Sequence, residues 1–292
     1  MTAIPALQTE ALGKRYRSHW ALRDCTLEIP AGSVTALVGP NGAGKTTLLH
    51  LAIGLSQPTT GDVRVLGWSA RREPSLVLPR IGFVAQTHPL YRGFTLEEML
   101  RLGRKLNARW DDQLARDRLE RLGLSLGQRA GKLSGGQQAQ LALTLALAKR
   151  PELLLLDEPV ASLDPLARRE FLQSLMEAVV DGGLTVLLSS HIVEDLERVC
   201  DRLVILSGGR VRLSGPIDEI VASHRLLTGG RRDPGTVARV HDVVRESHTE
   251  RQTTLLVRAN GHVYESCWQI DEVGLEEVVL AYLERRSEEV AA

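Results

Sequence analysis

Apolar residues follow two different spacings along this chain, and each spacing predicts a different kind of element. Short, nearly continuous apolar runs occupy 34–38, 153–156, 184–188 and 203–206. Runs of this kind are typical of strands in a parallel sheet that is covered on both faces. Segments 165–180 and 191–199 have helical spacing and would supply the cover. The pattern therefore predicts an α/β core.

The stretch from about 87 to 150 changes to a helical pattern. Thr95 is followed by Glu97 and Glu98, the arrangement expected at a helix N-terminus. A further helix is predicted from Ser134 to 148, because Pro151 disfavours its continuation. We therefore expect a helical subdomain inserted into the core.

Further strand-like segments lie before and after the first core strand, at 7–12, 25–29, 61–67 and 81–84. Beyond residue 223 the pattern is less regular. A linker or loop is predicted at 229–235, strands at 236–244 and 252–258, and an amphipathic helix at 274–286. We therefore divide the chain into a domain spanning 1–222 and a small α/β unit spanning 223–292.

The composition of the chain bears on whether it binds nucleic acid, on its redox compartment and on whether it can span a membrane. The 292 residues carry 36 Lys and Arg against 36 Asp and Glu, and aromatic residues make up only 4%. Balanced charge and few aromatic side chains weigh against nucleic acid, and no such partner is expected. The three cysteines are isolated from one another, as is common in a reducing cytosol. No apolar run approaches the ~20 residues that span a bilayer, so membrane contact would require a partner.

A glycine-rich loop follows the first core strand and leads into a helical pattern. Its residues are Gly39, Pro40, Asn41, Gly42, Ala43, Gly44, Lys45 and Thr46, followed by Thr47. Glycines allow backbone amides to point at phosphate oxygens at a helix N-terminus. The lysine of such a loop reaches the β- and γ-phosphates, and its threonine hydroxyl binds Mg²⁺. The sequence therefore predicts binding of a nucleoside triphosphate.

Further motifs narrow the class of nucleotide-binding protein, since a phosphate loop alone also fits kinases, GTPases and helicases. They are Gln86 after one predicted strand, Leu133-Ser134-Gly135-Gly136-Gln137, Asp157-Glu158-Pro159 after an apolar run, Ser162-Leu163-Asp164, and His191 after another strand. In this order they resemble the nucleotide-binding domain of ABC ATPases over about residues 7–220. The resemblance implies a P-loop NTPase core with a parallel sheet, an antiparallel β subdomain and a helical ABC subdomain, to which the C-terminal α/β extension is added.

The resemblance also implies roles in the hydrolysis of ATP. Glu158 would act as general base on the attacking water, with Gln86 and His191 as further catalytic residues. Tyr16 lies at the position where the family has an aromatic residue that stacks on adenine. The implied Mg²⁺ ligands are Thr46, Gln86 and Asp157.

Two protein partners are implied. Ser134, Gly135, Gly136 and Gln137 begin a helix, whose N-terminus favours an anion. In the family this segment faces the phosphate loop of a second subunit, with Asp164 at the junction, so a homodimer is expected. The other partner is a multispanning membrane subunit, which would hold the chain at the cytoplasmic face of the cell membrane.

The expected contact with the membrane subunit is the segment 87–94, which resembles the family's groove for a helix of that subunit. Leu90, Tyr91 and Phe94 are expected to be exposed there. The single ATPase domain and the helix at 274–286 resemble subunits of drug, antibiotic or lipid exporters whose membrane subunit is a separate chain. The acidic loop of exporters with fused membrane domains is not evident in 127–132.

The sequence also departs from the family pattern. Ala139-Gln140 stands where a Gln-Arg pair is common, and Leu145 where arginine is frequent. We expect these changes to affect helix packing or partner contacts.

The alternative function is a soluble ABC ATPase that acts in assembly, repair or translation. Repair members usually carry zinc sites or coiled-coil insertions, and translation members carry two ATPase domains; the sequence has neither feature. A nucleotide sensor without turnover is a third hypothesis, which Glu158 and His191 disfavour.

Overall fold

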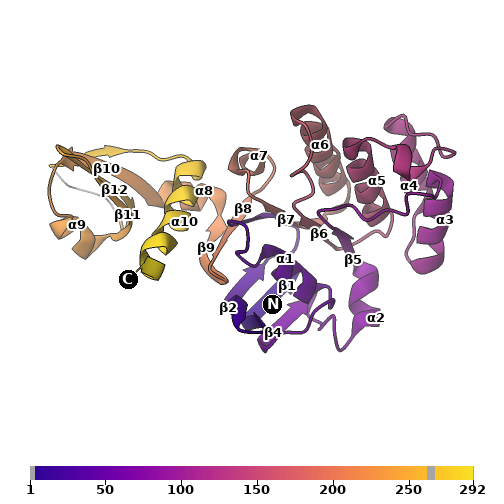
Figure 1. The fold of residues 1–292 in the computed structure, drawn as a ribbon, viewed down its shortest axis with the longest axis horizontal. Helices are drawn as coiled ribbons and strands as arrows, with labels where there is room; N and C mark the ends of the chain where they lie inside the picture. The colour runs from indigo at the N-terminus through magenta and orange to yellow at the C-terminus, as the bar shows by residue number, and fades with distance from the viewer. Residues whose placement is uncertain (1–3, 262–266, 292) are drawn as a thin grey trace.

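The computed structural model describes residues 4–261 and 267–291, which form three sheets with helices packed around them (Figure 1). The first is a three-stranded antiparallel sheet with the order β2-β1-β4. Its strands are β1 (Leu7–Tyr16), β2 (His19–Ile29) and β4 (Thr60–Val65). This sheet confirms the strand segments predicted on both sides of the first core strand.

The central sheet has six strands in the order β5-β6-β7-β3-β8-β9. They are β3 (Val34–Val38), β5 (Ile81–Val84), β6 (Leu153–Asp157), β7 (Thr185–Ser190), β8 (Arg202–Ser207) and β9 (Arg210–Pro216). The first five strands in this order are parallel, and β9 is antiparallel to β8. The parallel sheet predicted from the apolar runs is therefore confirmed.

Both faces of the central sheet are covered. On β6, Leu154 and Leu156 join one hydrophobic cluster, while Leu153 and Leu155 join another on the opposite face. Helix α6 (Pro165–Gly182) contributes Phe171 to the first cluster. Helix α1 (Lys45–Ala52) packs in the second cluster together with the antiparallel sheet. The alternation of strand residues between the two clusters explains why β6 is apolar at successive positions.

The helical subdomain consists of α3 (Leu96–Leu106), α4 (Asp112–Arg121) and α5 (Gly135–Leu147), with the short turn η2 (Ala130–Lys132) before α5. The short elements α2 (Pro74–Val77) and η1 (Leu78–Arg80) connect β4 to β5, and Val77 of α2 packs in the second cluster. Thr95 caps α3 as predicted. Its hydroxyl accepts from the amide of Glu98 at 3.2 Å, and the Glu98 carboxylate accepts from the Thr95 amide at 2.8 Å. The subdomain has a hydrophobic cluster of its own.

The C-terminal unit is built on a four-stranded antiparallel sheet with the order β11-β12-β10-β13. Its elements are α8 (Ile217–Ser223), β10 (His224–Gly230), α9 (Gly235–Val240), β11 (Asp242–His248), β12 (Gln252–Arg258), β13 (Gln269–Asp271) and α10 (Leu275–Ala291). An α/β unit was predicted here, and the helix predicted at 274–286 is α10.

Three predicted elements are wrong in detail. The loop predicted at 229–235 is shortened to 231–234, because Gly229 and Gly230 complete β10 and pair with β12, and Gly235 begins α9. A Cβ on Gly229 would lie 3.0 Å from the Trp268 ring, so the glycine fits under that side chain. The strand at 236–244 begins only with β11; the residues before it form α9, whose Val237 is buried. The helix at 191–199 is shortened to α7 (Val193–Glu197), since the Ser190 hydroxyl accepts from the Ile192 amide and holds a turn there.

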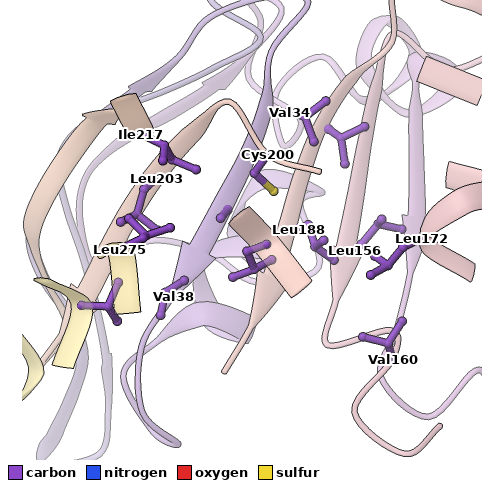
Figure 2. Close-up of a cluster of buried hydrophobic side chains, with 14 of the residues drawn as sticks. Val34, Val38, Leu156, Val160, Leu172, Leu188, Cys200, Leu203, Ile217 and Leu275 are labelled. Atoms are coloured by element: carbon purple, nitrogen blue, oxygen red, sulfur yellow. The ribbon is translucent and has the colours of Figure 1, made fainter. Parts of the chain in front are cut away.

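The C-terminal helix shares its core with the central sheet. Leu275 of α10 belongs to the same buried cluster as Val34, Leu203 and Ile217, which lie on or beside the sheet (Figure 2). Tyr282 of α10 bonds through its hydroxyl to the buried His224 at 3.2 Å. The division at residue 222 stays a prediction, and the unit that follows it is not isolated from the rest of the core.

Among residues 4–261 and 267–291, no helix combines the length and apolar character needed to cross a membrane.

A substitution in α10 tests the shared core. Leu275 is 1% exposed, so Leu275→Ala is expected to lower the free energy of unfolding by about 2–5 kcal/mol. Leu280→Ala, at a position 46% exposed on the same helix, is expected to change it by less than about 0.5 kcal/mol. Urea unfolding followed by circular dichroism measures both. Equal stability of the two variants would show that α10 does not complete this core.

Candidate functional site

The predicted site residues gather at one edge of the central sheet. Strands β5, β6, β7 and β3 are neighbours and run parallel, so their carboxyl ends meet at the same edge. Gln86 follows β5, Asp157 ends β6, His191 follows β7, and the glycine-rich loop follows β3. Residues distant in sequence are thereby brought to one place.

A cleft of about 530 Å³ lies at this edge. It is lined by Tyr16, His19, Ala21, Asn41, Gly42, Ala43, Gly44, Lys45, Thr46, Thr47, Gln86 and Glu158. Most of the predicted nucleotide ligands thus share one cleft. His19 and Ala21 are additions that the sequence did not indicate; they belong to β2, which brings the antiparallel sheet to the site.

The glycines of the loop are required by close backbone contacts. Gly44 precedes α1 with a φ of 108°, and a Cβ there would lie 2.5 Å from the carbonyl oxygen of Ala21. A Cβ on Gly39 would clash with the carbonyl of Leu206. The loop is therefore packed against β2 and β8, while the first amides of α1 have no partner within the helix. Such a helix N-terminus fits a phosphate group.

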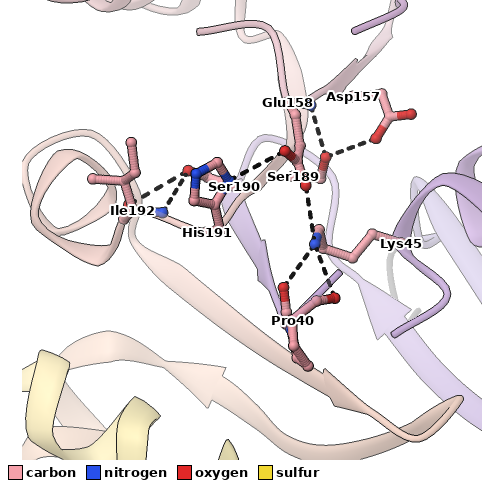
Figure 3. Close-up of polar contacts among 9 residues, drawn as sticks. Pro40, Lys45, Asp157, Glu158, Ser189, Ser190, His191 and Ile192 are labelled. Atoms are coloured by element: carbon pink, nitrogen blue, oxygen red, sulfur yellow. Dashed lines mark hydrogen bonds and ion pairs between the residues drawn. The ribbon is translucent and has the colours of Figure 1, made fainter. Parts of the chain in front are cut away.

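The Lys45 ammonium lies at the centre of a polar network (Figure 3). It donates to the carbonyls of Gly39 at 2.6 Å and Pro40 at 3.4 Å, and it forms an ion pair with Glu158 Oε1 at 3.0 Å. Lys45 is only 5% exposed, so this pair is largely shielded from solvent. A phosphate bound to Lys45 would compete with the Glu158 carboxylate for the same ammonium.

Glu158 is held in an unusual backbone conformation. Its φ is 44°, a region that residues with a Cβ seldom adopt. Its amide donates to the Ser189 hydroxyl at 2.9 Å, and that hydroxyl donates to Asp157 Oδ1, also at 2.9 Å. Its second carboxylate oxygen lies 3.1 Å from His191 Nδ1 (Figure 3). Lys45, Glu158 and His191 therefore form one continuous chain of contacts.

Ser189 is a residue of the candidate site that the sequence analysis missed. It is fully buried and joins the side chain of Asp157 to the backbone of Glu158. The polar pair Ser189-Ser190 at the end of an apolar strand was the available signal, because buried polar side chains need partners.

The three predicted Mg²⁺ ligands lie at two depths. Thr46 and Gln86 are exposed and line the cleft, whereas Asp157 is 3% exposed and lies beneath it, bonded to Ser189. Mg²⁺ commonly keeps several waters and uses one or two carboxylates together with phosphate oxygens. The donor set fits this chemistry. No cluster of three or more His, Cys, Asp or Glu suited to a metal occurs in the described part of the chain.

Tyr16 lies at the rim of the cleft and is 47% exposed. The Lys14 ammonium lies 4.9 Å from the centre of its ring. The ring is therefore accessible to a planar ligand, and a cationic group stands beside it.

The residues at the start of α5 that were predicted to contact a nucleotide, Ser134, Gly135, Gly136 and Gln137, do not line this cleft. Ser134 caps α5: its hydroxyl accepts from the Gln137 amide at 3.3 Å, and Gln137 Oε1 accepts from the Ser134 amide at 3.0 Å. Ser134 and Gly135 are exposed. Gly136 packs against α6, since a Cβ there would lie 2.8 Å from the Ala167 Cβ.

Asp164 also lies outside the cleft and has a structural role. One of its carboxylate oxygens accepts from the amides of Leu166 and Ala167, at 3.1 and 3.0 Å, and caps α6. The tips of α5 and α6 thus form a second polar, exposed site on the same chain.

A groove of about 440 Å³ lies between the segment after β5 and the helical subdomain. Tyr91 is 61% exposed and Phe94 38%, with their rings stacked at 5.1 Å. Leu90 was expected to be exposed, which is wrong: it is half-buried because it packs on the hydrophobic cluster of the helical subdomain. His88 also lines the groove, and burial lowers its pKa, which favours the neutral ring.

The three departures from the family pattern lie on α5. Ala139 is fully buried, and Gln140 is 5% exposed, with neither side-chain oxygen nor nitrogen bonded within the described residues. Leu145 lines the groove and packs on the helical cluster. The changes therefore affect packing and the groove rather than the cleft.

Comparison with known proteins agrees with this geometry. Residues 22–161 match the model of the family described as "ABC transporter". The Nod factor export ATP-binding protein I of Neorhizobium galegae is 36% identical over 72% of this chain and 62% of its own length. The phosphonates import ATP-binding protein PhnC of Thiobacillus denitrificans is 36% identical over 75% of this chain and 90% of its own.

Among solved structures, a dimeric bacterial ABC transporter cassette superimposes with a TM-score of 0.65 and 26% identity, covering 72% of this chain and 98% of the cassette. The fold, the order of the motifs and these relatives agree. The chain belongs to the family of ABC transporter ATP-binding proteins and is an ATPase of the ABC type.

Proposed function

We propose that this chain binds and hydrolyses ATP with Mg²⁺ to power transport through a separate multispanning membrane subunit, at the cytoplasmic face of the cell membrane. One observation carries this proposal. The phosphate loop and the general-base candidate share one cleft, whereas the predicted second phosphate-binding tip at the start of α5 lies outside it, and an apolar groove is lined by the C-terminal half of the same helix. A lone nucleotide-binding enzyme needs neither of the last two features.

In the proposed complex, the amides of Gly42 to Thr47 and the Lys45 ammonium would hold the phosphates, and Tyr16 would stack on adenine. This assignment is supported by the unpaired amides at the start of α1 and by the exposure of Tyr16. Thr46, Gln86 and Asp157 would hold Mg²⁺, which when bound neutralises charge on the phosphate oxygens. The remaining loop residues, Gly39 to Asn41, would fix the backbone conformation of the loop and so the positions of its amides.

Glu158 would act as general base once it leaves Lys45. Both of its carboxylate oxygens are engaged, one by Lys45 and the other by His191. Phosphate binding at Lys45 would free one oxygen to accept a proton from water, while His191 keeps the other in place. His191 is 48% exposed, and in the proposed complex it would also contact the terminal phosphate. Exchange of partners at Lys45 would thus link nucleotide binding to activation of the base.

A second copy of the chain would complete each site. Ser134, Gly135, Gly136 and Gln137 present the positive end of α5 to solvent, with Asp164 nearby at the tip of α6. In the proposed symmetric homodimer these tips contact the nucleotide in the partner's cleft. The dimeric form of the similar cassette supports this arrangement.

We propose export as the direction of transport, with a drug, antibiotic or lipid-like molecule as substrate. The relative named for Nod factor export supports this direction, while the relative named for phosphonate import represents the alternative. The direction of transport is tested with inverted membrane vesicles, by measuring the movement of candidate substrates across their membrane with and without ATP. ATP-driven uptake into inverted vesicles would support export, and ATP-driven efflux from them would contradict it.

Removal of the base tests the proposed catalytic role. Glu158→Gln is expected to lower the rate of ATP hydrolysis about 100-fold or more, because an amide cannot accept the proton. Nucleotide affinity should be kept. Glu152→Gln, at the opposite end of β6, is the matched control and is expected to hydrolyse ATP at the unmodified rate. A phosphate-release assay measures both, and an unmodified rate for Glu158→Gln would overturn the assignment.

Lys45→Ala tests the phosphate-binding role. The variant is expected to lose tight ATP binding, by about tenfold or more, because a charge-assisted contact to phosphate disappears. Lys105→Ala removes an exposed lysine of α3 and should bind ATP normally. Fluorescence titration with a labelled ATP analogue measures both affinities. Equal affinity of the two variants would place the nucleotide elsewhere.

The docking groove is tested by its exposed aromatic residues. Tyr91→Ala or Phe94→Ala is expected to reduce the amount of multispanning membrane protein that co-purifies with the chain. The reason is that each native aromatic side chain exposes a large apolar area beside the groove, which the substitution removes. Leu55→Ala, at an apolar site that is 70% exposed and does not line the groove, is the control. Unchanged recovery with both aromatic variants would defeat the docking assignment.

A further inference from the structure

Ser189 contacts both residues of the Asp157-Glu158 motif through a single oxygen atom. Its hydroxyl donates to Asp157 Oδ1 and accepts from the Glu158 amide, each over 2.9 Å (Figure 3). Asp157 and Ser189 are paired residues of β6 and β7, so their side chains leave the sheet on the same face. The contact therefore follows from the register of the central sheet.

This face of the sheet is the one that α1 covers. Leu155 and Leu187 lie two residues earlier on β6 and β7, and both pack in the same hydrophobic cluster as α1. Helix α1 begins with Lys45 and Thr46, directly after the glycines of the phosphate loop. The Asp157 carboxylate is therefore on the side of the sheet where the proposed nucleotide would be bound.

The bond from the Glu158 amide fixes the direction of the Ser189 hydroxyl. A serine hydroxyl carries one hydrogen, and the amide, itself a donor, occupies a lone pair of the oxygen. The hydrogen of the hydroxyl therefore goes to Asp157 Oδ1. Ser189 is fully buried, so bulk water does not compete for this hydrogen. The backbone of Glu158 thus determines which bond Ser189 makes to Asp157.

The bond from Ser189 in turn fixes the orientation of the Asp157 carboxylate. Rotation of an aspartate carboxylate about its last bond is only weakly restricted, so a bond to one oxygen decides where the other points. Oδ2 makes no hydrogen bond within the described residues and points away from Ser189 (Figure 3). Carboxylates that bind metals are themselves usually held by hydrogen bonds, and loss of the holding group typically lowers metal affinity by about 10–100-fold. Oδ2 is therefore the oxygen that is left for a cation.

We propose that Ser189 is a positioning residue for Mg²⁺: its hydroxyl holds the Asp157 carboxylate with Oδ2 directed toward the cation, and the Glu158 amide holds the hydroxyl. This inference rests on the proposed function. A purely structural role, in which Ser189 only gives the Glu158 amide an acceptor, predicts a different result. It would affect nucleotide binding equally with and without Mg²⁺, whereas the positioning role affects only binding with the cation.

The test measures how much Mg²⁺ tightens nucleotide binding. Fluorescence titration with a labelled, non-hydrolysable ATP analogue gives one Kd in EDTA and one in Mg²⁺, and the first divided by the second isolates the contribution of the cation. Ser189→Ala is expected to lower this Kd ratio about tenfold, by weakening binding in Mg²⁺ and leaving binding in EDTA unchanged. A Kd ratio equal to that of the unmodified chain, or an equal loss of affinity in both conditions, would contradict the inference.

A second substitution at the same position separates the hydrogen bonds from the space that the side chain fills. Ser189→Cys keeps a side chain of similar size, but sulfur is a weak hydrogen-bond donor and acceptor. Ser189→Cys is therefore expected to lower the Kd ratio as Ser189→Ala does. A normal Kd ratio in Ser189→Cys would show that packing, and not the hydroxyl, is responsible.

Ser207→Ala is the matched control. Ser207 is a fully buried serine at the end of β8, and its hydroxyl makes no hydrogen bond within the described residues. The substitution therefore removes a buried hydroxyl from a neighbouring part of the same sheet without removing a bond. Its Kd ratio is expected to equal that of the unmodified chain, and a loss as large as that of Ser189→Ala would show that the effect is not specific to Ser189.

Asp157→Asn is the reference for the cation site itself. It removes the charge of the proposed ligand and is expected to lower the Kd ratio at least as much as Ser189→Ala. If Asp157→Asn lowers the Kd ratio and Ser189→Ala does not, the inference about Ser189 fails and the proposed Mg²⁺ site stands. If neither variant lowers it, the proposed Mg²⁺ site and this inference both fail.

Discussion

Parallel pairing of β5, β6, β7 and β3 is the constraint on which the site depends. Neighbouring parallel strands must end at the same edge, so the residues that follow them meet there whatever their separation in sequence. The glycine-rich loop, the two carboxylates and His191 owe their proximity to this pairing. The buried side chains on both faces of β6 fix the register, because a shift by one residue would exchange its two apolar faces.

The same edge also brings the Glu158 carboxylate to Lys45, where it would compete with a phosphate group of the proposed nucleotide. Lys45 and Glu158 are both largely buried, and each is compensated by the other in the free chain. A buried charge is costly without a partner, so neither can be released until another charge replaces it. In the proposed function, this ion pair would make Glu158 available as a base only after phosphate has bound to Lys45. His191 and Ser189 limit where the released carboxylate can go.

Much of this arrangement could be predicted from the sequence. Continuous apolar runs identified the strands. The candidate site was identified by three motifs: the glycine-rich loop, Ser134 to Gln137, and Asp157-Glu158. Each motif could be recognised because its residues are neighbours in the sequence. Contacts between distant segments could not be predicted. The Lys45–Glu158 pair and the Ser189–Asp157 bond depend on which strands are neighbours, and no local pattern records that. The end of β10 at Gly229 and Gly230 was missed because its stability comes from contact with Trp268 and pairing with β12 rather than from strand propensity.

The central claim is that the cleft of one copy is completed by the α5 tip of another. Two defective chains test it, each built on Glu158→Gln: one adds Lys45→Ala, and the other adds Gly135→Asp. Gly135 is exposed, and a Cβ there meets only Leu163 at 4.0 Å, so the aspartate fits and repels phosphate. Light scattering with ATP should show that neither chain pairs alone, whereas their mixture pairs and retains one nucleotide per pair, because one intact cleft then faces one intact tip. A mixture that pairs no better than its separate components would contradict the account.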